Sequence, residues 1–95
     1  MADHLLNKEI SEADVARALQ HIWQSVLGTP VEPADNFFDL DGDSFEAVRI
    51  LVRIRSELGC EVSLLDIFDR PSIEELAPIV TESLKRARDA SAISA

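Results

Sequence analysis

The chain has 95 residues, of which 46% are apolar, and a formal net charge of −9. This length provides one small domain with a single core and excludes a second lobe or a deep catalytic cleft. The negative charge excludes nucleic acid as a partner, because it repels phosphate rather than releasing counterions. Few glycines, no tyrosine and many aliphatic residues favour helices over a sheet.

Cys60 is the single cysteine, which excludes a disulfide framework and a cysteine metal site. We expect it to be a small buried apolar residue. The sequence shows neither a signal-peptide pattern nor an apolar run long enough to cross a bilayer. The expected location is therefore the cytoplasm, without membrane contact.

The first predicted helix begins after Ser11, where Ser11 and Asp14 form a start signal, and ends at Leu27. Apolar residues recur at helical spacing along it, at Val15, Ala18, Leu19, Ile22 and Val26. Residues 1–10 carry no such pattern and are expected to be flexible.

A long loop separates this helix from the next one. Gly28 and the prolines after it end the first helix, and no new helical pattern begins before Asp43. A loop of this length in a small domain is unusual and often functional. Phe37, Phe38 and Leu40 are expected to anchor it, because burying one such side chain contributes ~1.5–3 kcal/mol.

The second predicted helix runs from Ser44 to Leu58. Asp43 can cap its first turn, and Glu46 completes a capping-box pair three residues later. Ser44 then lies at the first helical position, beside unpaired backbone N–H groups and the positive end of the helix dipole. An anion esterified to its hydroxyl is favourably placed there.

This helix carries two apolar stripes. One is the expected core face, made of Ala47, Ile50, Leu51, Ile54 and Leu58. The other is made of Phe45, Val48 and Val52 and is either covered by the loop or the short third helix, or kept for docking; we favour docking. Arg49 and Arg53 lie in a charged row beside it, which is either a solvated face or a surface that selects partners by charge.

A short helical turn is predicted at 64–68, followed by a last helix that begins at Ser72 and carries its apolar stripe to Leu84. Pro78 lies inside that pattern and predicts a kink or an early end. The tail, 85–95, has little to bury and is expected to be disordered.

The ordered domain is therefore predicted to span 11–84 and to be all-α, with three main helices, one short helix and a long loop between the first and second helices. Six acidic residues and no basic residue occur between positions 32 and 46. They are Glu32, Asp35, Asp39, Asp41, Asp43 and Glu46. A basic protein surface is the natural complement of this segment.

The segment 37–45, FFDLDGDSF, resembles the carrier-protein superfamily, most closely the peptidyl carrier (thiolation) domains of nonribosomal peptide synthesis. Their signature reads Phe-Phe-x-Leu-Gly-Gly-(His or Asp)-Ser-(Leu or Ile), so Asp41 replaces the first glycine and Phe45 the usual aliphatic residue. A second match, IFDRPSIEELA at 67–77, resembles the Leu-Phe-x-x-Pro-Thr-Ile-x-x-Leu-Ala that leads into their last helix. The resemblance covers roughly 12–82 and implies a four-helix fold.

The resemblance also implies that Ser44 receives 4′-phosphopantetheine from coenzyme A and that the thiol of this arm carries an aminoacyl or acyl group. A phosphopantetheinyl transferase would supply the base and Mg²⁺, so the chain itself has no catalytic residue and no metal site. Gly42 would let that enzyme approach closely, and Asp43 is either a plain cap or also positions metal or phosphate.

Carriers dock partners through the residues just after the serine, which agrees with the docking stripe. The implied partners are an adenylation or acyl-loading enzyme and downstream condensing or tailoring enzymes, as in antibiotic biosynthesis. We expect a monomer.

Two other functions share features with this motif. A GDSL-type esterase also places serine after Gly-Asp, but it needs a base, and the two histidines, His4 and His21, both precede Ser44. Aspartates at 39, 41 and 43 have the spacing of an EF-hand, but Ser44 and Ile50 stand where glycine and glutamate are required. Both are disfavoured.

Two alternatives stay open. Asp41 is tolerated in the acyl carriers of polyketide or fatty acid synthesis, whereas the paired phenylalanines and the Pro71 segment favour the peptidyl type. The second alternative is an acidic helical interaction module that is never modified.

Overall fold

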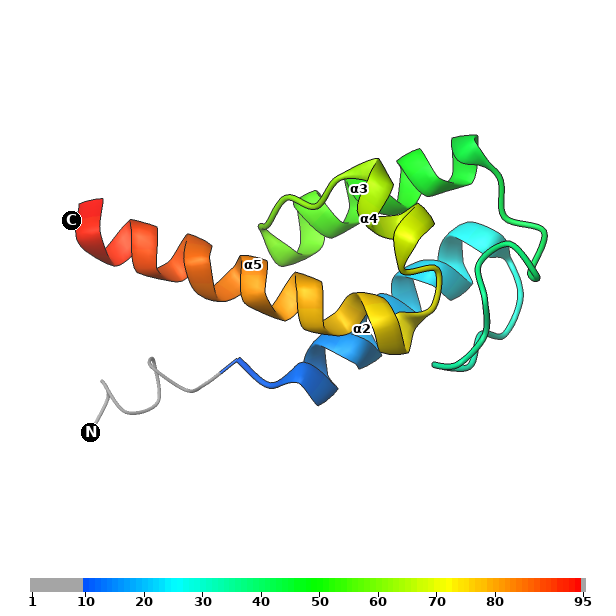
Figure 1. Cartoon of the computed structure of the whole chain (residues 1–95), viewed down its shortest axis with the longest axis horizontal. Coiled ribbons are helices and arrows are strands. Elements are labelled where there is room, and N and C mark those ends of the chain that lie inside the picture. The colour runs from blue at the N-terminus through cyan, green and yellow to red at the C-terminus, as the bar shows by residue number, and fades with distance from the viewer. Residues whose placement is uncertain (1–9, 95) are drawn as a thin grey trace.

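The computed structural model describes residues 10–94, with side chains described as far as residue 87. It contains the helices α2 (Glu12–Leu27), α3 (Ser44–Leu58), α4 (Leu64–Asp69) and α5 (Ile73–Ser94), and no strand within these residues (Figure 1). This confirms the predicted all-α bundle with one short helix and a long first loop. Except for Ile10, the segment predicted to be flexible lies outside the described residues.

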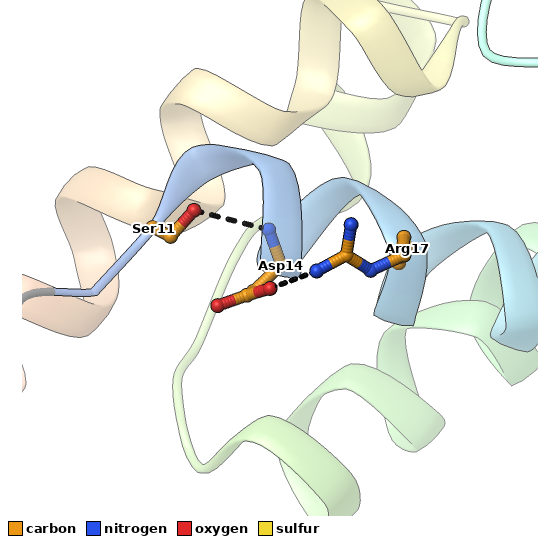
Figure 2. Close-up of polar contacts among 3 residues, drawn as sticks. All are labelled: Ser11, Asp14 and Arg17. Carbon is orange, nitrogen blue, oxygen red and sulfur yellow. Dashed lines mark hydrogen bonds and ion pairs between the residues drawn. The ribbon is translucent and has the colours of Figure 1, made fainter.

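Local signals in the sequence set the ends of α2. The Ser11 hydroxyl accepts a hydrogen bond from the Asp14 backbone N–H at 3.3 Å, and the Asp14 carboxylate pairs with Arg17 one turn later (Figure 2). At the other end Gly28 adopts a left-handed conformation with φ 70° and donates its N–H to the Gln24 carbonyl. Glycine takes this conformation without steric cost, so the helix stops there.

The core lies where α2 packs on α5 and α3, with α4 against α3 and α5. Its fully buried side chains include Leu19, Ile22, Trp23, Phe37, Ile50, Ile54, Ile67, Ile73, Leu76 and Val80. Most of these residues belong to the predicted apolar stripes, whereas Trp23 was not included in them. Trp23 lies on the buried face of α2 with Leu19, Ile22 and Val26, and its ring meets Phe37 of the loop edge-on, with ring centroids 5.6 Å apart.

Helix α5 is longer than the sequence pattern indicates. It continues through Pro78, which is exposed, so the early end predicted at this proline does not occur. It also continues past Leu84 to Ser94, where disorder was expected, and its last turns extend beyond the rest of the bundle (Figure 1). Alanine, lysine and arginine, which are frequent in this segment, have high helix propensity and favour this extension. The domain boundary at 84 stays a prediction.

The loop between α2 and α3 is held by hydrogen bonds at both ends. The Val31 N–H donates to Gln24 Oε1 at 3.0 Å, and Gln20 Nε2 donates to the Val31 carbonyl at 2.6 Å. Further along, the Phe37 N–H donates to the Pro71 carbonyl at 2.6 Å. These bonds satisfy backbone groups that the loop would otherwise leave unpaired. They hold it against α2 and the start of α5.

The three predicted apolar anchors of the loop differ in their burial. Phe37 is fully buried and Leu40 is partly buried, whereas Phe38 is 46% exposed. Phe38 lies on the surface between Phe37 and Phe68, with ring centroids 5.5 and 5.7 Å away. Phe38 therefore contacts α4 at the surface through Phe68, whereas Phe37 anchors the loop in the core.

No helix within residues 10–94 combines the length and apolar character that crossing a membrane requires.

Candidate functional site

The candidate site is the junction where the loop becomes α3. Asp43 has an extended backbone, and its carboxylate accepts the Glu46 N–H at 2.9 Å. In return Glu46 Oε1 accepts the Asp43 N–H at 3.4 Å, which confirms the predicted capping box. Ser44 is the first residue of α3 and is exposed. The capping pair Asp43 and Glu46 therefore fixes the start of α3 at Ser44, while the side chain of Ser44 stays accessible.

The Ser44 hydroxyl makes no hydrogen bond with any described residue. His21 is exposed on α2 and is not paired with it. A nucleophilic serine needs a base within hydrogen-bond reach. Within the described residues, the serine therefore lacks the partner that an esterase would require.

The turn before Ser44 has the hydrogen-bond pattern of a helix end. The Gly42 N–H donates to the Phe37 carbonyl at 3.0 Å, and the Asp41 N–H donates to the Phe38 carbonyl at 3.1 Å. This is the pattern of a Schellman motif, and Asp41 occupies its left-handed position with φ 64°. Aspartate adopts this conformation more readily than most residues. The departure of Asp41 from the glycine of the carrier signature is therefore tolerated.

Gly42 has a structural role that the sequence did not reveal. A Cβ on this residue would lie 2.5–2.6 Å from ring atoms of Phe37. Such a contact is too short for real atoms, so any side chain at 42 would displace the buried ring. Close packing against Phe37 therefore requires a glycine here, whether or not an enzyme approaches Ser44.

The surface around Ser44 is acidic. Asp39, Asp41 and Asp43 are all exposed, and none of them forms an ion pair with a described residue. Within residues 10–94, no group of three or more carboxylate, histidine or cysteine side chains is arranged to hold a metal ion. This end of α3 therefore carries a concentration of negative charge.

The second stripe of α3 is uncovered. Phe45 is 72% exposed, Val52 is 57% exposed and Val48 is 46% exposed. Neither the long loop nor α4 buries them, which excludes one of the two predicted roles of the stripe. Leu65 on α4 is also exposed and was missed, because a helix of six residues is too short to show a periodic pattern.

An open hollow of about 220 Å³ lies beside this stripe. It is lined by Val26, Val48, Arg49, Val52 and Arg53. The sequence placed Val26 in the core only, but its side chain also forms part of this surface. The structure thus brings together four of the five predicted docking residues, while Phe45 lies outside the hollow.

Comparison with known proteins gives the family. Residues 17–79 match the family described as "Phosphopantetheine attachment site". The chain belongs to this family. The matched segment contains Ser44, its capping residues and most of the described core, and the family implies 4′-phosphopantetheine as the covalent cofactor.

Sequence relatives of this carrier protein are peptide synthetases. It is 36% identical over 74 residues to tyrocidine synthase 3 of Brevibacillus parabrevis, which is 77% of this chain and 1% of the synthase. The chain thus spans a very small part of the relative's length. This similarity and the family match confirm the predicted peptidyl carrier protein.

Solved structures of carriers have the same fold. A docking-domain complex of the Pax nonribosomal peptide synthetase, PaxA T1-CDD with PaxB NDD, is 27% identical with a TM-score of 0.74, covering 84% of this chain and 78% of that one. BlmI, a type-II acyl carrier protein of Streptomyces verticillus, is 24% identical with a TM-score of 0.73, covering 77% and 89%. At 24% identity, the similarity to BlmI shows a shared fold alone.

Proposed function

We propose that Ser44 is the residue of this carrier protein that receives 4′-phosphopantetheine, and that the thiol of the arm holds an aminoacyl or related acyl group. The observation that carries this proposal is the exposed, unpaired hydroxyl at the first residue of α3, inside the matched segment. A phosphodiester there lies at the positive end of the helix dipole, which favours its charge by ~0.3–1 kcal/mol.

The other serines of the matched segment fit this role less well. The Ser25 hydroxyl bonds to Arg53, and Ser63 and Ser72 accept hydrogen bonds from the backbone as helix caps, Ser72 being buried as well. Ser56 is exposed, but it lies near the end of α3, where the dipole disfavours an anion. Ser44 combines exposure with a favourable electrostatic position.

On this proposal the chain performs no chemistry of its own. The phosphopantetheinyl transferase would supply the base that removes the Ser44 proton and the metal that binds the phosphates. The chain contributes a hydroxyl held in place by the Asp43–Glu46 capping box and by the packing of Phe37 against Gly42.

The partners of the loaded arm would dock on Phe45, Val48 and Val52, the stripe that follows Ser44 on α3. These would be an adenylation or acyl-loading enzyme, then condensing or tailoring enzymes. Support comes from the exposure of all three side chains in a domain that buries its other large apolar residues on α3.

The proposal is tested by incubating the chain with coenzyme A, Mg²⁺ and a broad-specificity transferase, and then labelling it with a maleimide under native conditions. Cys60 is buried, and burial raises the pKa of its thiol, so it should not react. We expect no label before the reaction and one label after it. A chain that gains no label after exposure to an active transferase would instead be the unmodified interaction module.

A further inference from the structure

The exposed side of α3 is divided by charge. Its first turn and the preceding loop carry acidic side chains: Asp39, Asp41, Asp43 and Glu46. Its later turns carry Arg49, Arg53 and Arg55 and a single acid, Glu57, which pairs with Arg53. The three arginines are among the nine Lys and Arg residues of a chain of net charge −9. A partner that covers both ends of α3 must therefore be basic at one end and acidic at the other.

The hollow described above lies within the basic part of this face. Val26 of α2 with Val48 and Val52 of α3 make its apolar lining, and Arg49 and Arg53 complete it. An aliphatic side chain that entered this space would displace water from the valines. It would also bring any neighbouring carboxylate close to the guanidinium groups.

The two arginines differ in how they are held. Arg53 donates a hydrogen bond from Nη1 to the Ser25 hydroxyl at 3.0 Å and pairs with Glu57 through Nε. These contacts hold its side chain in place and partly neutralise its charge. Arg49 is exposed and pairs with no described residue. Arg49 is therefore the cation of the hollow whose charge is available to a partner.

We propose that this hollow binds an acidic amphipathic helix of a partner protein, with an aliphatic side chain on the valines and a carboxylate on Arg49. This inference rests on the proposed function, since it names the chemistry of one partner of the carrier. A second copy of the chain is the alternative occupant of the hollow, and its binding would be seen as a dimer. The acids beside Ser44 and the cations of the hollow would together set the orientation of the partner.

The test uses the unmodified chain and two amphipathic helical peptides, one built from Leu and Glu and the other from Leu and Lys. Binding is followed by ¹⁵N–¹H NMR at about 0.1 M salt. This concentration screens long-range attraction between charges but leaves short-range contacts in place. We expect the Leu–Glu peptide to shift the amides around Val48–Arg53. Replacing its leucines by alanine should abolish the shift.

Two variants of equal charge locate the contact. Arg49→Glu should weaken binding of the Leu–Glu peptide at least about fivefold. Arg55→Glu changes the net charge equally, but Arg55 lies outside the hollow and 3.9 Å from Glu61, so it should change the affinity less than twofold. Equal weakening by the two variants would show a general charge effect and would overturn the proposal.

Two further results would overturn it. The first is a Leu–Glu peptide that shifts no amide of the hollow. The second is a dimer of the chain, seen by sedimentation at the concentration of the NMR sample, that Arg49→Glu dissociates. The peptide experiment does not need the phosphopantetheine arm. A negative result with the peptides therefore does not affect the maleimide test of Ser44, and a negative maleimide test does not affect the interpretation of peptide binding.

Discussion

The ring of Phe37 fills the space that a side chain on Gly42 would need, with its Cζ atom 2.5 Å from the position of such a Cβ. The ring is fully buried and meets Trp23 edge-on. The turn before Ser44 is thus tied to the centre of the bundle. Through this contact, packing in the core sets the position of the tether.

Gly42→Ala should lower the free energy of unfolding by ~1–3 kcal/mol, because the new methyl group overpacks the site against Phe37. The measurement is urea unfolding followed by circular dichroism. The double variant Gly42→Ala, Phe37→Leu should lose less free energy of unfolding than the sum of the losses in the two single variants, since the smaller side chain makes room for the methyl group. A Gly42→Ala variant as stable as the parent would contradict the contact.

Asp41→Gly should raise the free energy of unfolding by up to about 1 kcal/mol. Glycine removes ~1–2 kcal/mol of left-handed strain, partly offset by its greater freedom in the unfolded chain. Asp41→Ala removes the same charge but keeps the strain, so it should be less stable than Asp41→Gly under the same thermal unfolding conditions. If the alanine variant were the more stable of the two, the strain argument would fail.

Asp43→Ala should cost ~0.5–2 kcal/mol, because it removes the carboxylate that caps α3. The matched control is Asp39→Ala, which removes an equal charge from an exposed residue whose carboxylate caps no helix. Melting temperature and the rate of pantetheinylation are measured for both variants. A lower melting temperature with an unchanged rate would leave Asp43 as a cap alone, whereas a slower rate would add a role in the transfer.

Phe45→Ala should slow transfer or loading by a partner enzyme while changing stability by less than about 0.5 kcal/mol, because this side chain is 72% exposed. Phe45→Leu keeps an apolar group at the site and should retain most of the rate. The comparison uses initial rates at partner concentrations below saturation. Unchanged rates in Phe45→Ala and in Val48→Ala would refute docking on this stripe.

Local signals in the sequence predicted much of the fold. The ends of α2 and α3 follow from Ser11, Gly28, Asp43 and Gly59, since caps and left-handed glycines act over a few residues. The second stripe of α3 could be recognised from its spacing, but whether another segment covers it could not, and the structure leaves Phe45, Val48 and Val52 exposed.

Contacts between distant residues could not be predicted in this way. Three features depend on how separate segments meet. They are the approach of Phe37 to Gly42, the contact of Trp23 with the loop and the hollow between Val26 and Val52. Helix α5 also continues past Leu84, the last residue of its predicted apolar stripe. An apolar stripe does not indicate this extension, whereas the helix propensity of alanine, lysine and arginine favours it.

The most direct test of the central claim is the intact mass of the chain after reaction with coenzyme A and a broad-specificity transferase, measured in parallel for the parent, Ser44→Ala and Ser56→Ala. The account predicts a gain of one phosphopantetheine in the parent and in Ser56→Ala, and none in Ser44→Ala, with all three folded by circular dichroism. A gain that persists in folded Ser44→Ala would place the arm elsewhere and contradict the account.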